Sequence, residues 1–138
     1  MTDRWNNRVM IWKSAPAKNT PPDLVLGQPD FTQNNPGTGL PQMNWPCAVS
    51  LGANGRLAVA DAYNDRLLLW NTLPASNGTP ADLQIPLRPL TPPGRPQQFA
   101  WPWGVWTDGT RLVASATSGG ALLFWNAWPG ASNTPPAF

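Results

Sequence analysis

The stretch AVADAYNDRLLLW at residues 58–70 decides the fold of this chain. It holds two apolar runs separated by a short polar turn, which is the pattern of two antiparallel strands joined in a hairpin. Apolar runs that end in Trp recur as NRVMIW at residues 7–12 and GALLFW at residues 120–125. The three final Trp residues lie 58 and 55 positions apart, and a Pro-containing linker follows each run. The chain is therefore a tandem repeat.

Each repeat unit contains further apolar segments. The matching pairs are NWP at 44–46 with AWP at 100–102, GRLAVA at 55–60 with TRLVAS at 110–115, and DLVLG at 23–27 with DLQIP at 82–86. Asn54-Gly55 and Asp108-Gly109 predict hairpin turns, because these residue pairs tolerate positive φ. The 18 Pro and 12 Gly disfavour long helices. Four antiparallel strands per unit predict an all-β protein built from β-propeller blades.

Residues 58–70 resemble the NHL repeat, in which a strand ending in Ala-Asp precedes a short Asn-containing turn and an Arg-led apolar strand. DRWNNRVMIW at residues 3–12 repeats this pattern. The linkers and LVLGQPDF at 24–31 are similar to a long-linker bacterial type of NHL-like propeller. The third copy departs from the pattern, with Ser115 aligned to the Asp, Ala121 to the Arg, and a turn one residue longer. The resemblance implies the fold and favours a secreted or cell-envelope location, whereas function stays open because propellers host unrelated activities.

The register of the repeats predicts about two and a half blades in an incomplete ring. With strands lettered A to D from the ring centre outward, residues 1–42 supply strands C and D, 43–98 supply A to D, and 99–138 supply A to C. Such an arc exposes strand edges and apolar blade faces that neighbours normally cover. Two interpretations follow. Either the chain completes a ring with copies of itself or with a complementary propeller segment, or the sequence is part of a longer polypeptide.

Several residue types needed for catalysis are missing from the sequence. It contains no His and no Glu, which excludes His-based triads and His-ligated zinc. The Asp residues are scattered, without the clustered spacing of a calcium loop. We therefore predict no catalytic residue, no metal and no cofactor. The net charge of +2 is spread without a basic stripe, and no apolar stretch is long enough for a membrane span, so neither nucleic acid nor membrane is an expected partner.

The repeated positions are expected to be structural. Asp3 with Arg8, and Asp61 with Arg66, are predicted to form a strand-turn-strand bridge in each copy. The recurring aromatic residues at the ends of the three apolar runs are predicted to pack between blades. These are Trp12, Trp70 and Trp125.

The candidate ligand residues lie in the B–C turns and D–A loops, which emerge on one face of a propeller. Aromatic rings beside Asn and Arg suit stacking on sugars or gripping a peptide. The candidates are Arg4, Trp5, Asn6, Trp45, Tyr63, Asn64, Trp101 and Trp103. The leading hypothesis is a non-catalytic binding or scaffold module. The alternatives are a lectin-like carbohydrate-binding propeller and a fragment of a propeller enzyme whose catalytic residues lie outside this chain.

Overall fold

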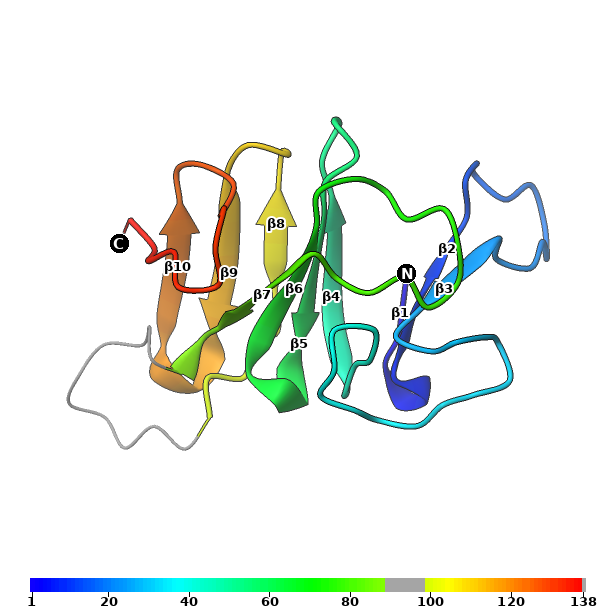
Figure 1. The fold of residues 1–138 in the computed structure, drawn as a ribbon, viewed down its shortest axis with the longest axis horizontal. Helices are drawn as coiled ribbons and strands as arrows, with labels where there is room; N and C mark the ends of the chain where they lie inside the picture. The colour runs from blue at the N-terminus through cyan, green and yellow to red at the C-terminus, as the bar shows by residue number, and fades with distance from the viewer. Residues whose placement is uncertain (89–98, 138) are drawn as a thin grey trace.

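The computed structural model describes residues 1–88 and 99–137 and consists of three antiparallel sheets. The first sheet contains β1 (Thr2–Asp3), β2 (Arg8–Ile11) and β3 (Leu24–Leu26). The central sheet contains β4 (Pro46–Leu51), β5 (Leu57–Asp61), β6 (Arg66–Trp70) and β7 (Leu83–Pro86). The third sheet contains β8 (Val105–Thr107), β9 (Leu112–Ala116) and β10 (Ala121–Trp125). Figure 1 shows the three sheets side by side, with the four-stranded sheet in the middle.

The same short connection joins β1 to β2 in the first sheet, β5 to β6 in the central sheet and β9 to β10 in the third sheet. A single 3-10 turn occupies this place in every sheet: η1 (Arg4–Asn6), η2 (Ala62–Asn64) and η4 (Thr117–Gly119). The residue after each turn has left-handed backbone angles, with φ of 52° at Asn7, 52° at Asp65 and 61° at Gly120. Asn, Asp and Gly are the residues that adopt this conformation most readily. The three turns lie at one end of the molecule, at the bottom of Figure 1.

The central sheet is buried on both faces, and this explains its continuous apolar runs. Every residue of β5 and β6 is buried. Leu67 and Leu69 pack toward the third sheet in a core that includes Trp125. Leu68 and Trp70 point the opposite way, into a second core that they share with residues of the first sheet. Alternate residues of one strand therefore fill two different cores.

The structure confirms the mostly β composition and corrects two details of the expected strand layout. The sequence predicted two strands for the first unit, but Thr2 pairs with Val9 and Asp3 with Arg8, which adds the short strand β1. The alignment of Ser115 with the signature Asp was wrong. Ala116 pairs with Ala121 as Asp61 pairs with Arg66, so Ala116 occupies that position.

The expected extra residue in the third turn is also wrong, because η2 and η4 are equally long. One of the D–A loops expected from the sequence runs from Arg88 to Trp101, and its residues 89–98 lie outside the described residues. Phe138, which aligns with Leu83 at the start of an outer strand, also lies outside them. Within the described ranges, no helix has the length and apolar character needed to cross a membrane.

Candidate functional site

Five aromatic side chains form a continuous line at the end of the molecule that carries the 3-10 turns. The line consists of Trp5, Trp45, Tyr63, Trp101 and Phe99, and Trp103 lies beside Trp45, Tyr63 and Trp101. We call these six residues the aromatic row. Successive ring centroids are 5.0, 4.7, 5.8 and 6.2 Å apart. The first two contacts are edge-to-face, with interplanar angles of 88° and 86°, a favourable geometry for aromatic pairs. The row begins in η1 of the first sheet, passes through η2 of the central sheet and ends on the segment that leads into β8.

Two members of the row have an unusual backbone conformation. Trp45 has a φ of 57° and Trp101 a φ of 48°, and a bulky residue at positive φ is an outlier that local sequence does not favour. Contacts with the preceding sheet hold both residues. The Trp45 N–H donates to Asn7 Oδ1 at 2.9 Å, and the Trp101 N–H donates to Asp65 Oδ1 at 2.9 Å. The residue that ends one sheet's 3-10 turn therefore fixes the Trp that opens the next sheet.

Arg4 places a positive charge against the aromatic row. Its guanidinium carbon lies 4.8 Å from the ring centroid of Trp45, 5.9 Å from that of Trp5 and 5.8 Å from that of Trp103. Contacts of this kind stabilise the cation by its attraction to the ring faces. The ion pairs found within the described ranges involve Arg8, Arg66, Arg88 and Arg111, so Arg4 is not paired with a carboxylate there.

The aromatic row is a surface, not a cleft. Trp5 is 73% exposed, Tyr63 and Trp103 are each 47% exposed, and Phe99 is 44% exposed. A narrow pocket between Trp45, Tyr63, Trp101 and Trp103 is closed to a water-sized molecule. A ligand at this site would lie on exposed ring faces and would not enter a cavity.

Two of the predicted ligand residues have structural contacts instead of facing the row. Asn6 Nδ2 donates to both carboxylate oxygens of Asp3 at 3.0 Å. Asn64 Nδ2 donates to Asp61 Oδ2 at 2.7 Å and to the Gly37 carbonyl at 2.8 Å. The structure brings the other candidates together: Arg4, Trp5, Trp45, Tyr63, Trp101 and Trp103.

The two expected Asp-Arg bridges are present and support the loops that lead to the site. Arg66 Nε lies 2.8 Å from Asp61 Oδ2, and both side chains are buried. The remaining N–H groups of this guanidinium donate to Gln84 and to the carbonyls of loop residues Thr38, Gly39 and Gln42. Burial raises the pKa of Asp61, opposed by hydrogen bonds from Asn44 N–H, Asn64 and Arg66. In the first sheet, Arg8 pairs with Asp3 at 2.8 Å and donates to the Phe31 carbonyl.

The recurring Trp residues hold their own linkers as well as packing between sheets. Trp70 and Trp125 are each 2% exposed, whereas Trp12 is only partly buried. Each indole N–H donates to a Thr carbonyl in the following linker. The pairs are Trp12 with Thr20 at 2.8 Å, Trp70 with Thr79 at 3.1 Å, and Trp125 with Thr134 at 3.0 Å.

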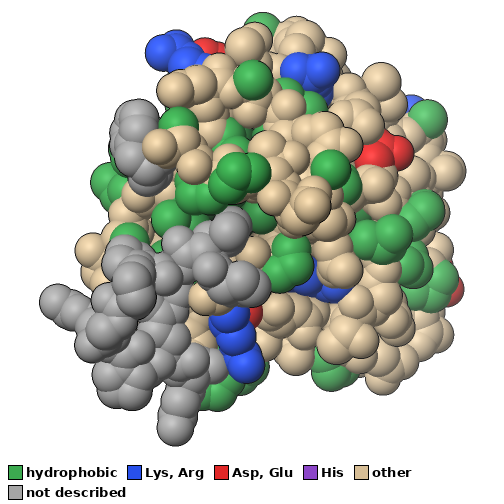
Figure 2. Space-filling model, turned by 60° about the vertical axis from the view of Figure 1, so that its left-hand side comes forward, with side chains coloured by type: hydrophobic (Ala, Val, Ile, Leu, Met, Phe, Trp, Pro, Cys, Tyr) green, Lys and Arg blue, Asp and Glu red, His purple; other side chains and the backbone are tan. Residues whose placement is uncertain are grey.

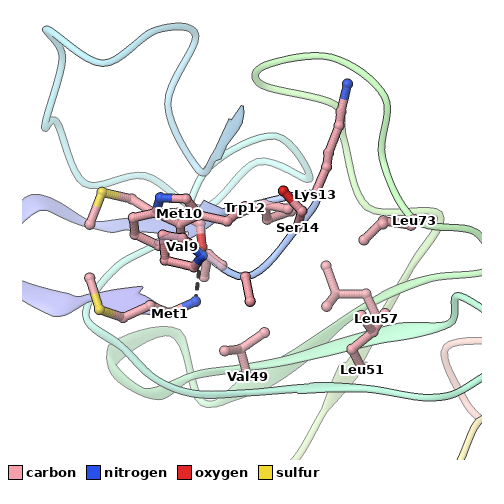
Figure 3. Close-up of a pocket in the computed structure, with 13 residues that line it drawn as sticks. Met1, Val9, Met10, Trp12, Lys13, Ser14, Val49, Leu51, Leu57 and Leu73 are labelled. Atoms are coloured by element: carbon pink, nitrogen blue, oxygen red, sulfur yellow. Dashed lines mark hydrogen bonds between the residues drawn. The ribbon is translucent and has the colours of Figure 1, made fainter. Parts of the chain in front are cut away.

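A second hollow, of about 350 Å³, lies between the first and central sheets. Figure 3 shows Val49, Leu51 and Leu57 on one side of it and Met10 and Trp12 on the other. Its lining is mainly apolar and contains no carboxylate. The hollow offers few polar groups that could orient a ligand, so the aromatic row is the better candidate site.

Sequence reasoning missed two features of the site. Phe99 extends the row beyond Trp101, and no repeat position pointed to it. The acceptors Asn7 and Asp65 were also missed, although both directly precede the Arg of the signature, and comparing the copies at that position would have found them. Among the described residues, no group of three or more His, Cys, Asp or Glu side chains could hold a metal ion.

No protein-family model matches this chain, and neither does any curated protein with which it was compared.

Proposed function

We propose that this chain is an arc of an NHL-like β-propeller and acts as a non-catalytic binding module through its aromatic row. The observation that carries this proposal is the support given to the row. Two of its residues, Trp45 and Trp101, have a strained backbone conformation, and hydrogen bonds to side chains of the preceding sheet hold it in place. Strained residues persist only when their surroundings over-determine them, and they concentrate at functional sites.

The exposure of the row supports binding rather than packing. Moving a large aromatic side chain out of water is favourable, and soluble proteins seldom gather such side chains on one exposed face without a partner. Trp5 and Trp103 are the clearest cases, with 73% and 47% of their surface exposed. A ligand that covers these rings would remove their apolar surface from water, which favours binding.

The absence of a free base next to the row supports a non-catalytic role. Asp61 and Asp65 lie beside the row, and both are buried and paired with Arg66 and Arg88. Asp3, which is next to Arg4 in the sequence, is paired with Arg8. The sequence has no His and no Glu to take their place. Asp61 also accepts the Asn44 N–H, and Asp65 accepts the Ala100 N–H, so both carboxylates act as structural acceptors.

Glycan and peptide arrays test the proposal. The wild-type chain should retain at least one ligand class, and the double variant Trp5→Ala/Trp103→Ala should lose it. Phe31→Ala is the control, since Phe31 is an aromatic residue that is 38% exposed and is not part of the row. A chain that binds nothing on either array, or whose binding survives the double variant, contradicts the proposal.

We further propose that a second copy of this chain covers the outward faces of the first and third sheets. Leu122 on the third sheet is 59% exposed, whereas Leu67, at the same repeat position of the central sheet, is fully buried against the third sheet. Trp12 on the first sheet is the repeat counterpart of the buried Trp70. The outward face of the third sheet is thus equivalent to the face of the central sheet that packs against the third sheet. The outward face of the first sheet is equivalent to the face of the central sheet that packs against the first sheet.

The two outward faces therefore suit each other head to tail, in the same packing that the chain already uses twice within itself. Figure 2, which turns the third-sheet side of the molecule forward, shows patches of apolar side chains and few charged ones. Trp106 and Leu122 line a shallow apolar groove there, together with Val105 and Val113. Continued stacking of equivalent sheets is how repeat proteins bury such faces.

A further inference from the structure

The guanidinium of Arg4 has unused hydrogen-bonding capacity at the end of the aromatic row that begins with Trp5. An Arg side chain carries five N–H donors in a fixed planar fork. Arg8, Arg66, Arg88 and Arg111 each donate to an Asp, and Arg56 donates to the Gly109 carbonyl. Within the described ranges, the side chain of Arg4 has only its three indole contacts. Its N–H groups are therefore available to an acceptor from outside the chain.

The carboxylates around the row do not neutralise this charge. Asp3 is adjacent to Arg4 in sequence, but its oxygens accept from Arg8 Nε and Asn6 Nδ2. Asp61 and Asp65 are buried, and they pair with Arg66 and Arg88. At the far end of the row, the Arg88 guanidinium carbon lies 4.9 Å from the centroid of Phe99, but Asp65 pairs with Arg88 at 2.7 Å and balances its charge. Arg4 therefore gives the row its net positive charge, which favours a ligand that carries negative charge.

The orientation of the rings indicates the shape of that ligand. Neighbouring rings at the start of the row are nearly perpendicular, at 88° and 86°, so they form no parallel slot for a flat aromatic group. They expose separate ring faces instead. The C–H-bearing face of a saturated sugar ring fits such a surface, because it lays apolar hydrogens against the electron-rich face of one indole at a time.

We propose that the aromatic row binds an acidic oligosaccharide built from hexuronic acid residues. The carboxylate of one residue accepts two N–H groups of Arg4, in the bidentate geometry that guanidinium and carboxylate share. The sugar rings lie on the exposed faces of Trp5 and Trp103, whose indoles also hold Arg4 in place. This inference rests on the proposed binding function and adds the chemical class of the ligand.

Isothermal titration with a short galacturonic acid oligomer and with its methyl ester tests the inference. The ester keeps the sugar rings and removes the charge. The acidic oligomer should bind the wild-type chain at least about tenfold more tightly than the ester, the size of effect expected from a charge-assisted hydrogen bond. Arg4→Gln should remove this preference, and Arg4→Lys should retain part of it. Arg111→Gln is the control, because Arg111 is also an exposed Arg that lies on an indole, that of Trp106, outside the row.

The outcomes separate the inference from the function on which it rests. Equal binding of acid and ester, or a preference that survives Arg4→Gln, overturns the acidic ligand while the binding function stands. The same holds if neither oligomer binds but the arrays show another ligand that depends on Trp5 and Trp103. If no ligand depends on those two residues, both proposals fail. The amide NMR spectrum of Arg4→Gln should match the wild type outside the row, which shows that the variant is folded.

Discussion

Arg66 is the residue with the most hydrogen bonds around the candidate site. It ties β6 to the Asp61 carboxylate, to Gln84 and to three carbonyls of the loop that precedes Trp45. Its counterpart Arg8 makes the same bridge in the first sheet, but with side chains that remain 17% and 20% exposed. The same Asp-Arg bridge is therefore buried in the central sheet and partly exposed in the first sheet.

Removing Arg66 should be costly. Arg66→Met leaves the Asp61 carboxylate buried without its cation, and we expect a loss of about 3–5 kcal/mol in the free energy of unfolding. The partly exposed pair loses much less, so Arg8→Met should cost about 1 kcal/mol or less. Urea denaturation of both variants measures the difference. Similar losses for the two variants would show that burial is not what makes the Arg66 bridge important.

Asp108 is a surface carboxyl whose pKa lies well below its ordinary value. Hydrogen bonds from the backbone N–H groups of Arg111 and Thr110, and then from the Arg111 side chain, lower the pKa of Asp108 to about 2. Because its pKa in the folded chain lies below the unfolded value of 3.8, the charged form stabilises the β8–β9 turn above that pH. This contribution is lost as the pH falls through about 2.

A carboxyl carbon NMR titration should show that folded-state pKa directly. Arg111→Ala should raise the pKa of Asp108 only part of the way toward 3.8, because the two backbone donors, the larger cause of the shift, remain. A wild-type carboxyl that titrates at its ordinary value would contradict the turn geometry.

The 3-10 turns are the elements that join one sheet to the next. In the first two copies the residue after the turn both ends the turn and accepts N–H groups of the following sheet. Asp65 Oδ1 accepts from Ala100 N–H at 2.8 Å and from Trp101 N–H at 2.9 Å. The turn therefore sets the backbone of the aromatic row, and substitutions in it should affect the row at a distance.

Two substitutions at Asp65 separate these roles. Asp65→Gly keeps the left-handed conformation and removes the acceptor, which leaves two N–H groups without a partner and should destabilise the chain by about 2–4 kcal/mol. Asp65→Asn keeps an acceptor oxygen and should cost less than half as much. Hydrogen exchange at the Trp101 amide should speed up in the Gly variant. Unchanged exchange at Trp101 would mean that this contact does not hold the row.

The elements show how far the sequence could predict the structure. Repeat spacing located β5, β6, β9 and β10, because each follows a pattern shared between copies. The position of Ser115 was mistaken, although the match of residues 55–60 with 110–115 places Ser115 opposite Ala60. The pairing of Ala116 with Ala121 shows the true register. The left-handed backbone conformation of Trp45 and Trp101 could not be predicted from the sequence, because contacts with the preceding sheet impose it.

At the scale of the whole molecule, the proposed assembly depends on the outward faces of the first and third sheets. Light scattering should give a mass that is a multiple of 15.0 kDa. Leu122→Asp buries a charge in the proposed contact and should shift the chain toward the monomer. Leu40→Asp is the control, because Leu40 is an exposed loop Leu at 38% exposure. A wild-type monomer in which the amides of β2 and β10 are protected from exchange would contradict assembly through these faces.

Gly120 has a consequence for any such assembly. It stands where Asn7 and Asp65 provide the side-chain oxygen that secures the next sheet, and a glycine has none to provide. The third sheet also carries Ala116 and Ala121 in place of the Asp-Arg bridge. In the proposed assembly, dilution or mechanical force should therefore separate two copies before it separates the sheets within one chain, so that the contact between copies opens reversibly while each chain stays folded.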